Sequence, residues 1–99
     1  MQVTKNIEGD TLNVGLEGRL DTKTAPELES QLEADLKEVS NVVMDFTDLA
    51  YISSAGLRLL LSIQKTMTAK GGSLRITNAS DAVMDVFDVT GFTRILTIE

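Results

Sequence analysis

The chain of 99 residues has no cysteine, no histidine and no tryptophan, and it has only one proline and one tyrosine. Without cysteine, it forms no disulfide and offers no thiolate to a metal. Without histidine, it lacks the commonest general base and metal ligand in proteins. These absences argue against an enzyme, and we expect no catalytic residue, no metal and no cofactor.

Positive charge is also scarce, because 9 lysines and arginines stand against 15 acidic residues and leave a net charge of −6. Such a chain repels nucleic acid and anionic membranes, and its field favours a basic partner. No stretch reaches the roughly 18 apolar residues of a membrane helix. Residues 1–6 also lack the apolar core of a signal peptide. We therefore expect a cytoplasmic protein that binds neither nucleic acid nor membrane.

Hydrophobic patterning predicts one domain over residues 1–99. Leu12, Val14 and Leu16 alternate with polar residues as in a half-buried strand, and a turn at residues 8–10 joins them to an earlier strand. The elements that follow are a helix near 24–39, a strand near 42–46, a helix near 55–70, a strand at 73–77, a helix near 80–90 and a strand at 95–98. This order predicts an α/β fold with a mixed sheet of about five strands and three or more helices packed against it.

The sequence also predicts where several of these elements begin and end. Residues 18–21 are expected to leave the sheet, and Thr24 to cap the first helix. The apolar stripe of that helix comprises Leu28, Leu32, Leu36 and Val39. A short acidic loop is expected after the strand at 42–46. Gly71 and Gly72 are expected to end the second helix, and Gly91 the third.

The second helix is rich in leucine, and not all of its apolar residues fit one stripe. The residues expected on its inward face are Leu57, Leu60, Leu61, Gln64 and Met67. Leu59 and Ile63 fall outside this stripe. They either complete a helix that is buried on most sides or form part of an exposed docking patch.

Two serines, Ser53 and Ser54, stand directly before this helix. A serine oxygen accepts hydrogen bonds from the free N–H groups of a first helical turn, so the residues alone favour a capping role for Ser54. The same N–H groups and the helix dipole also stabilise negative charge. A hydroxyl here is therefore well placed to become a phosphate, which makes the position a candidate switch.

Five segments together resemble the STAS domain, and more narrowly the small bacterial anti-sigma factor antagonists. They are residues 18–21 (Gly-Arg-Leu-Asp), 45–49 (Asp-Phe-Thr-Asp-Leu), 51–57, 71–74 (Gly-Gly-Ser-Leu) and 86–92 (Val-Phe-Asp-Val-Thr-Gly-Phe). The resemblance covers nearly the whole chain with the motifs in order. It implies a single STAS domain over residues 1–99.

The resemblance also implies a function. Such an antagonist binds an anti-sigma factor that is itself a serine protein kinase, and this frees the sigma factor. The kinase phosphorylates a serine of the antagonist, which breaks the complex, and a phosphoserine phosphatase resets the system. We expect the protein to be a monomer or a weak homodimer.

The family motif Asp-Ser-Ser/Thr-Gly assigns roles to individual residues. With its glycine on Gly56, Ser54 is the phosphoacceptor, Ser53 stands where the family has aspartate, and Ala55 replaces the second hydroxyl. Asp45 or Asp48 are alternatives for the role of the missing acid, and as a metal site this pair is a weak signal. The partner-binding residues implied are Asp21, Ser53, Ser54, Ala55, Gly56, Leu57 and Leu59.

Other interpretations stay open at this point. Ser53 is either structural or a second acceptor, and Asp21 is either an ordinary loop acid or a partner-facing one. The departures at Ser53 and Ala55 leave room for a constitutive STAS scaffold, or for a small subunit of a transport or signalling assembly. A hydrolase that uses Ser54 is disfavoured, because the chain has neither histidine nor a Gly-x-Ser-x-Gly elbow.

Overall fold

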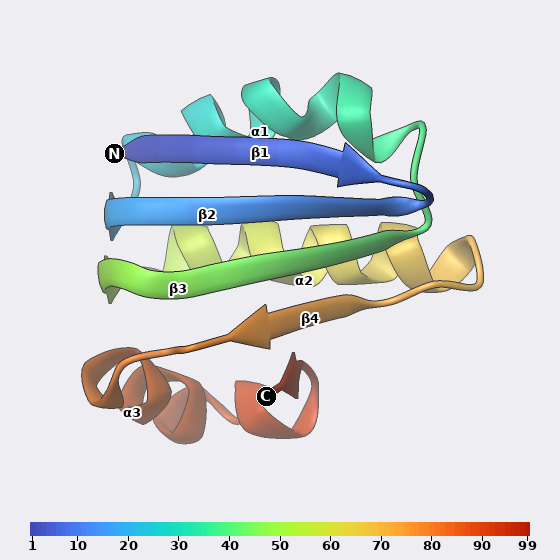
Figure 1. The fold of residues 1–99 in the computed structure, drawn as a ribbon. Coiled ribbons are helices and arrows are strands. Elements are labelled where there is room, and N and C mark those ends of the chain that lie inside the picture. Colours follow the sequence, from blue (N-terminus) through green and yellow to red (C-terminus); the bar gives the residue numbers. More distant parts are fainter.

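A computed structural model describes all residues from 1 to 99 (Figure 1). Its elements are, in chain order, β1 (Gln2–Glu8), β2 (Thr11–Leu20), α1 (Thr24–Leu36), β3 (Asn41–Ile52), α2 (Ser54–Ala69), β4 (Leu74–Thr77), α3 (Asp81–Thr90), a 3₁₀ turn (Phe92–Arg94) and β5 (Thr97–Ile98). The predicted order of strands and helices is thus confirmed.

The five strands form one mixed sheet in the order β1-β2-β3-β4-β5. β1 and β2 are antiparallel and joined by a turn at Gly9, whereas the three other pairings are parallel. In Figure 1, α1 and α2 lie behind the sheet, and α3 lies beyond β4 near the carboxyl end of the chain. The predicted α/β fold with a mixed five-stranded sheet is confirmed.

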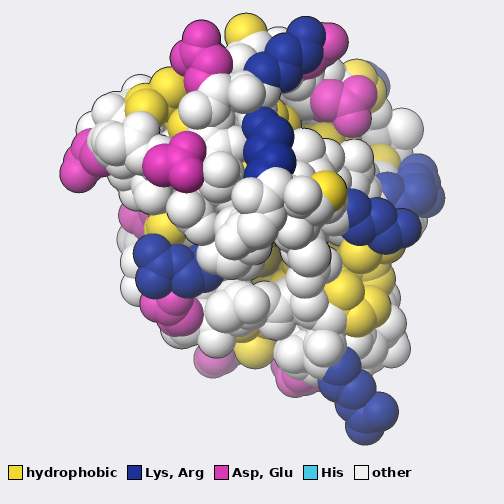
Figure 2. Space-filling view, turned by 90° about the vertical axis from the view of Figure 1, so that its right-hand side faces the viewer, with side chains coloured by type: hydrophobic (Ala, Val, Ile, Leu, Met, Phe, Trp, Pro, Cys, Tyr) yellow, Lys and Arg dark blue, Asp and Glu magenta, His cyan; other side chains and the backbone are white.

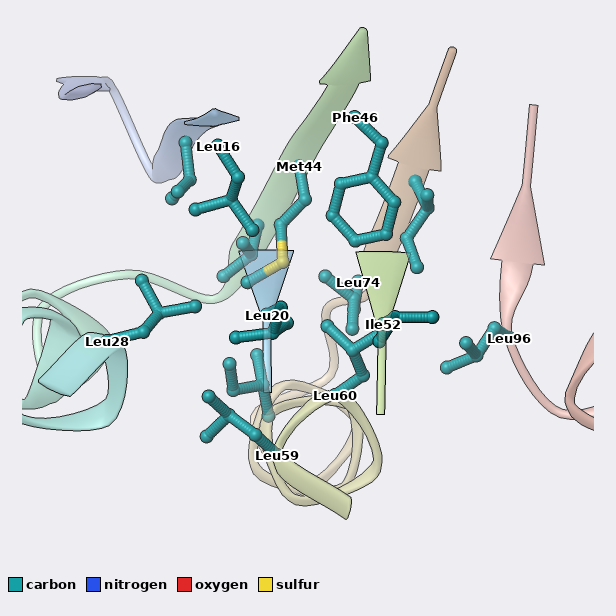
Figure 3. Close-up of a cluster of buried hydrophobic side chains, with 14 of the residues drawn as sticks. Leu16, Leu20, Leu28, Met44, Phe46, Ile52, Leu59, Leu60, Leu74 and Leu96 are labelled. Carbon is teal, nitrogen blue, oxygen red and sulfur yellow. The ribbon is translucent and has the colours of Figure 1, made fainter. Parts of the chain in front are cut away.

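One hydrophobic core of 23 buried residues lies between the sheet and its helices. Alternate residues of β2 and β3, such as Val14, Met44 and Phe46, point into it, while intervening residues such as Asp45 are exposed on the opposite face. Figure 3 shows side chains of the strands meeting Leu28 of α1 and Leu60 of α2. The face of the sheet away from the helices is therefore polar.

β2 and β3 are longer than the sequence predicts. β2 continues to Leu20 and β3 to Ile52, so the expectations that residues 18–21 leave the sheet and that an acidic loop follows residue 46 are both wrong. The β2–β3 register shifts between Gly15 and Glu17 and again between Gly18 and Arg19. Each shift inserts an extra residue in β3 and disturbs its alternation, which explains why this half of β3 shows no period of two.

The helices differ from prediction mainly at their ends. α1 stops at Leu36, so Val39 is buried but lies outside the helix. α2 stops at Ala69, and Gly71 follows with a φ of +82°. Gly91 ends α3 in the left-handed conformation, as predicted. None of the helices is both long and apolar enough to cross a membrane.

The buried residues of α2 are Gly56, Leu57, Leu59, Leu60, Ile63 and Met67. Leu59 and Ile63 are only 6% and 2% exposed, which confirms the first interpretation of these residues and rules out an exposed patch made by them. Leu61 and Gln64, both expected to point inward, are only partly buried. The wide buried surface arises because α2 is covered by the sheet and also packs beside α1.

The attachment of α3 to the core provides a first prediction. The rings of Phe46 and Phe87 have centroids 6.4 Å apart, and Phe87 is fully buried, whereas Val89 on the outer side of α3 is 88% exposed. We expect Phe87→Ala to lower the free energy of unfolding by about 3–5 kcal/mol, because it removes a large buried side chain and leaves a cavity. Val89→Ala is the matched control and should change it by less than about 0.5 kcal/mol.

Urea denaturation followed by circular dichroism measures both variants. Similar midpoints for Phe87→Ala and the parent chain would show that α3 contributes little to the cooperative core.

Candidate functional site

The candidate site lies at one end of the sheet, where β2 and β3 finish and α1 and α2 begin (Figure 1, left). Carboxyl ends of parallel strands are the usual place for binding sites in α/β folds. The backbone N–H of Ser53 donates to the carbonyl of Leu20 at 2.9 Å, which ties the start of α2 to the end of β2. This hydrogen bond brings the residues before α1 and those before α2 to one edge.

Ser53 is the N-cap of α2. Its backbone is extended (φ −99°, ψ 176°), and its hydroxyl oxygen accepts a hydrogen bond from the N–H of Gly56 at 3.4 Å. Its carbonyl accepts the N–H of Leu57 at 2.9 Å. The interpretation that Ser54 caps the helix is therefore wrong, because the cap lies one residue earlier.

Ser54 is the first residue of α2, and its side chain is exposed. Because Ser53 performs the capping, the Ser54 hydroxyl is not needed to hold the helix start. A charge added to it would face the free N–H groups and the positive end of the helix dipole, which stabilise an anion. The two neighbouring serines thus have different roles, one structural and one available for modification.

Gly56 permits the close approach of α2 to the ends of β2 and β3. A Cβ atom at this position would lie 2.8 Å from Cγ1 of Ile52 and 2.9 Å from Cγ of Leu20. It would also lie 3.1 Å from the Leu20 carbonyl oxygen. Leu57, the next residue, is buried with 4% of its surface exposed. These two residues position the helix start and present little side-chain surface to a partner.

Asp21 organises the loop before α1. Its Oδ1 atom accepts hydrogen bonds from the backbone N–H groups of Lys23 and Thr24 at 3.0 and 3.1 Å. The Thr24 hydroxyl accepts the N–H of Asp21 at 2.8 Å and lies 2.7 Å from the Arg19 carbonyl oxygen. Thr24 was expected to cap α1, but it is the first helical residue, and Asp21 supplies the oxygen that binds the first free N–H groups.

These contacts also set the charge of Asp21. The backbone N–H of Thr24 is the largest cause that lowers the pKa of Asp21 below its ordinary value of 3.8, and partial desolvation opposes it. The N–H of Lys23, the Thr24 hydroxyl and the charge of Arg19 lower the pKa further. Asp21 is therefore a carboxylate at neutral pH, next to the start of α2.

Arg19 is a site residue that sequence reasoning missed. Its guanidinium carbon lies 4.3 Å above the centre of the Tyr51 ring, and its Nε atom lies 3.8 Å from Oδ2 of Asp21. Arg19 and Tyr51 face each other in the β2–β3 register. Only a prediction that β2 and β3 extend to residues 20 and 52 reveals this pair.

A groove between α1 and α2 begins beside Ser54. One cavity of about 340 Å³ is lined by Thr22, Ala25, Pro26, Glu29, Ala55, Arg58, Leu59 and Ser62. A second cavity of about 380 Å³ shares Glu29 and Ser62 with the first and continues toward the carboxyl ends of both helices. We call these two cavities together the α1–α2 groove. Ala55 and Leu59 both line it.

Asp45 and Asp48 lie away from Ser54. Asp45 and Asp48 pair with Gly15 and Glu17 of β2, and at the rise of an extended strand these positions are about 16 Å and about 10 Å before the end of β2 at Leu20. The Thr47 hydroxyl is the largest cause that lowers the pKa of Asp45 below 3.8, and the Asn78 amide and the Thr47 N–H add to it. Asp45 thus binds Thr47 of its own strand and Asn78 after β4, and neither acid takes the place of the missing carboxylate beside Ser54.

The opposite end of the molecule carries the β1–β2 turn and the carboxyl ends of α1 and α2. Figure 2 looks at that end, and charged side chains of both signs are interspersed over it. Hydrophobic side chains come to the surface between them, chiefly on the side of the helices.

Comparisons with known proteins agree with this fold. Residues 2–99 match the STAS domain family. The anti-sigma-B factor antagonist of Bacillus subtilis (strain 168) is 30% identical over 94 residues, which cover 95% of this chain and 85% of the relative. The anti-sigma-B factor antagonist of Listeria monocytogenes serovar 1/2a is 27% identical over 96% of this chain and 84% of the relative.

Solved structures share the fold at lower identity. The anti-sigma factor antagonist SpoIIAA in its unphosphorylated form superposes with a TM-score of 0.85 at 20% identity, over 99% of this chain and 88% of its own. The phosphorylated form of the Bacillus cell fate determinant SpoIIAA gives 0.77 at 19% identity, over 99% and 91%. The chain belongs to the STAS domain family, and its relatives include bacterial anti-sigma factor antagonists.

Proposed function

We propose that this protein is a non-catalytic anti-sigma factor antagonist whose Ser54 end binds an anti-sigma factor with serine kinase activity, and that phosphorylation of Ser54 releases this partner. The observation that carries the proposal is an exposed serine at the first position of α2, released from capping by Ser53. The relatives named as antagonists support the partner class. The setting proposed is the cytoplasm, with a phosphoserine phosphatase to reset the switch.

The proposed contact surface comprises the loop at Asp21, the start of α2 and the end of the α1–α2 groove that lies beside Ser54. Ser53, Ser54 and Ala55 offer exposed or partly exposed surface there, and Leu59 lines the floor of the groove. Gly56 and Leu57 contribute through the backbone position that they impose on the helix start. The Asp21 loop is held by its own hydrogen bonds, so the surface is preformed and binding costs little conformational entropy.

Charge explains how such a switch operates. Phosphorylation adds about −1.5 to −2 charges and three acceptor oxygens at neutral pH. The start of α2 stabilises this charge, so the fold survives, whereas a partner surface packed against a neutral serine loses its fit. A coupling of about 1–3 kcal/mol weakens binding roughly 5–150-fold.

Because serine stands at position 53 in place of the family's aspartate, the group that accepts the hydroxyl proton of Ser54 has to come from elsewhere. Ser53 cannot act as a base, and Asp45 and Asp48 lie on β3 before the site. The kinase must therefore supply the group that accepts the hydroxyl proton, as protein kinases do with a catalytic aspartate.

A second candidate is a constitutive STAS scaffold, or a small subunit of a transport or signalling assembly. Ser53 and Ala55 favour it, because both depart from the acceptor motif of the switched antagonists. Under this alternative the Ser54 end binds its partner regardless of modification. The two candidates differ in what happens to Ser54 in the presence of a kinase.

Phosphate incorporation tests the acceptor directly. Incubation with the anti-sigma factor kinase and ATP should place one phosphate on the peptide that contains Ser53 and Ser54, as read by tandem mass spectrometry. Ser54→Ala should abolish the modification. Ser53→Ala should reduce it less, because the backbone still places Ser54 first in the helix. A peptide that stays unmodified in the parent chain would favour the scaffold.

Complex formation tests the effect of the charge. Ser54→Asp should weaken binding to the anti-sigma factor by about 5–150-fold in isothermal titration calorimetry, because it introduces a negative charge into the interface. Thr68→Asp adds the same charge near the far end of α2 and is the matched control. Equal affinities for the parent chain and Ser54→Asp would contradict a charge switch.

The Asp21 loop gives a pH-dependent prediction. Thr24→Val removes one hydroxyl that stabilises the Asp21 carboxylate, so the pKa of Asp21 should rise toward 3.8 in a carboxyl ¹³C NMR titration, while the pKa of Asp45 stays unchanged. A lowered pKa contributes stability that is present above the ordinary value and lost as the pH falls through the lowered one. Thr24→Val should therefore lose less stability than the parent chain in that acid range. An unmoved Asp21 pKa would exclude the hydroxyl as a cause.

A further inference from the structure

The outer face of α3 carries two parallel rows of side chains, one apolar and one acidic. Val83 and Phe87 attach the helix to the core. On the outer side, spacings of four and three place Ala82, Val86 and Val89 in one apolar row. The same spacings place Asp81, Asp85 and Asp88 in an acidic row beside it. We call these two rows the α3 outer face.

The apolar row is open to solvent at Ala82 and Val89, while Val86 between them is partly buried against the core. Val89 is 88% exposed, whereas the other exposed large hydrophobic side chains, Ile7, Tyr51 and Ile95, lie between 39% and 45%. A shallow hollow of about 240 Å³ lies along the row, lined by Asp85, Val86, Val89 and Thr90. A single exposed valine is ordinary, but a row with a hollow beside it is a surface that another apolar row can cover.

The acidic row is not neutralised within the protein. The three ion pairs of the chain join Lys5 to Asp35, Arg19 to Asp21 and Arg75 to Glu99, and none involves α3. The helix itself contains no lysine or arginine. An occupant that covers the apolar row therefore gains from cations placed along the acidic one.

From these observations we infer that the α3 outer face binds an amphipathic helix of another protein, with one apolar row and a neighbouring row of lysine or arginine. A second copy of this chain is disfavoured, because its net charge is −6 and its α3 has no lysine or arginine to pair with the acidic row. Nucleic acid and anionic lipid are disfavoured by the same charge. Helix-in-groove recognition of this type depends on anchors at spacings of three and four.

This surface is separate from the one proposed for the anti-sigma factor. α3 lies beyond β4, whereas α1 and α2, whose residues line the groove, lie behind strands β1 to β3 (Figure 1). Occupation of α3 consequently does not require an unmodified Ser54. The inference goes beyond the proposed function and stands or fails separately from it.

The test uses the full chain labelled with ¹⁵N and a synthetic helical peptide of about four turns, with leucine in one row and lysine in the next. We expect the peptide to shift amide resonances along α3. Val89→Ser should weaken the peptide about tenfold, and Val89→Leu should retain its affinity. Asp85→Asn should weaken it about two- to fivefold and reduce its dependence on salt. A peptide with glutamate in place of lysine is the matched control and should not bind.

The outcomes separate the occupants and the two proposals. Ser54→Asp should leave the peptide affinity unchanged, so loss of the anti-sigma factor contact does not affect this measurement. Shifts confined to the Ser54 end, or an affinity insensitive to Val89→Ser, would overturn the inference. Shifts of α3 that follow protein concentration without peptide would show self-association and would overturn it as well.

Discussion

The parallel pairing of β2 with β3 is the constraint on which the rest of the structure depends. It aligns two strands that both continue to the same edge of the sheet, and it admits two extra residues in β3 without separating them. The hydrogen bond from the Ser53 N–H to the Leu20 carbonyl closes this edge. Both helix starts are therefore fixed by one ladder of backbone bonds, which a single side-chain substitution on the surface cannot displace.

Close packing at this edge limits which residue types fit at the start of α2. Gly56 allows α2 to approach Leu20 and Ile52 within distances that exclude a Cβ atom. The helix start is thus held by backbone contacts and buried apolar groups, while its exposed side chains are free to vary. Such an arrangement suits the proposed switch, since a phosphate on Ser54 would neither insert into the core nor replace a cap.

Sequence patterns predicted most of the fold because most elements have a clear period. The helices at 24–36, 54–69 and 81–90 repeat apolar residues every three or four positions, and β2 alternates at its start. The second half of β3 escaped prediction because its bulges replace alternation with a spacing near three, from Phe46 to Leu49 to Ile52. The Arg19–Tyr51 contact was therefore not predicted either, since the two residues face each other only if both strands continue.

The candidate site was likewise predicted only in part. The resemblance of residues 51–57 to a family motif indicated Ser54, but local propensity could not decide which of two serines caps the helix, because both have the same side chain. The extended backbone of Ser53, fixed by pairing with Leu20, decides it. Likewise, Thr24 and Asp21 are both good capping residues, and only the path of the chain after β2 brings the carboxylate of Asp21 to the free N–H groups.

Serine in place of aspartate at position 53 preserves the fold while changing the electrostatics. Serine and aspartate cap helices almost equally well, so the start of α2 does not depend on the acid. Aspartate would keep a negative charge beside the acceptor in both states. With serine, the unmodified helix start has no acidic side chain in its first turn, and the phosphate becomes the only strong negative charge there. The partner surface facing Ser54 therefore meets no carboxylate from α2 itself, only that of Asp21 on the loop before α1, and in the proposed switch the charge of the first turn of α2 would change with the phosphate alone.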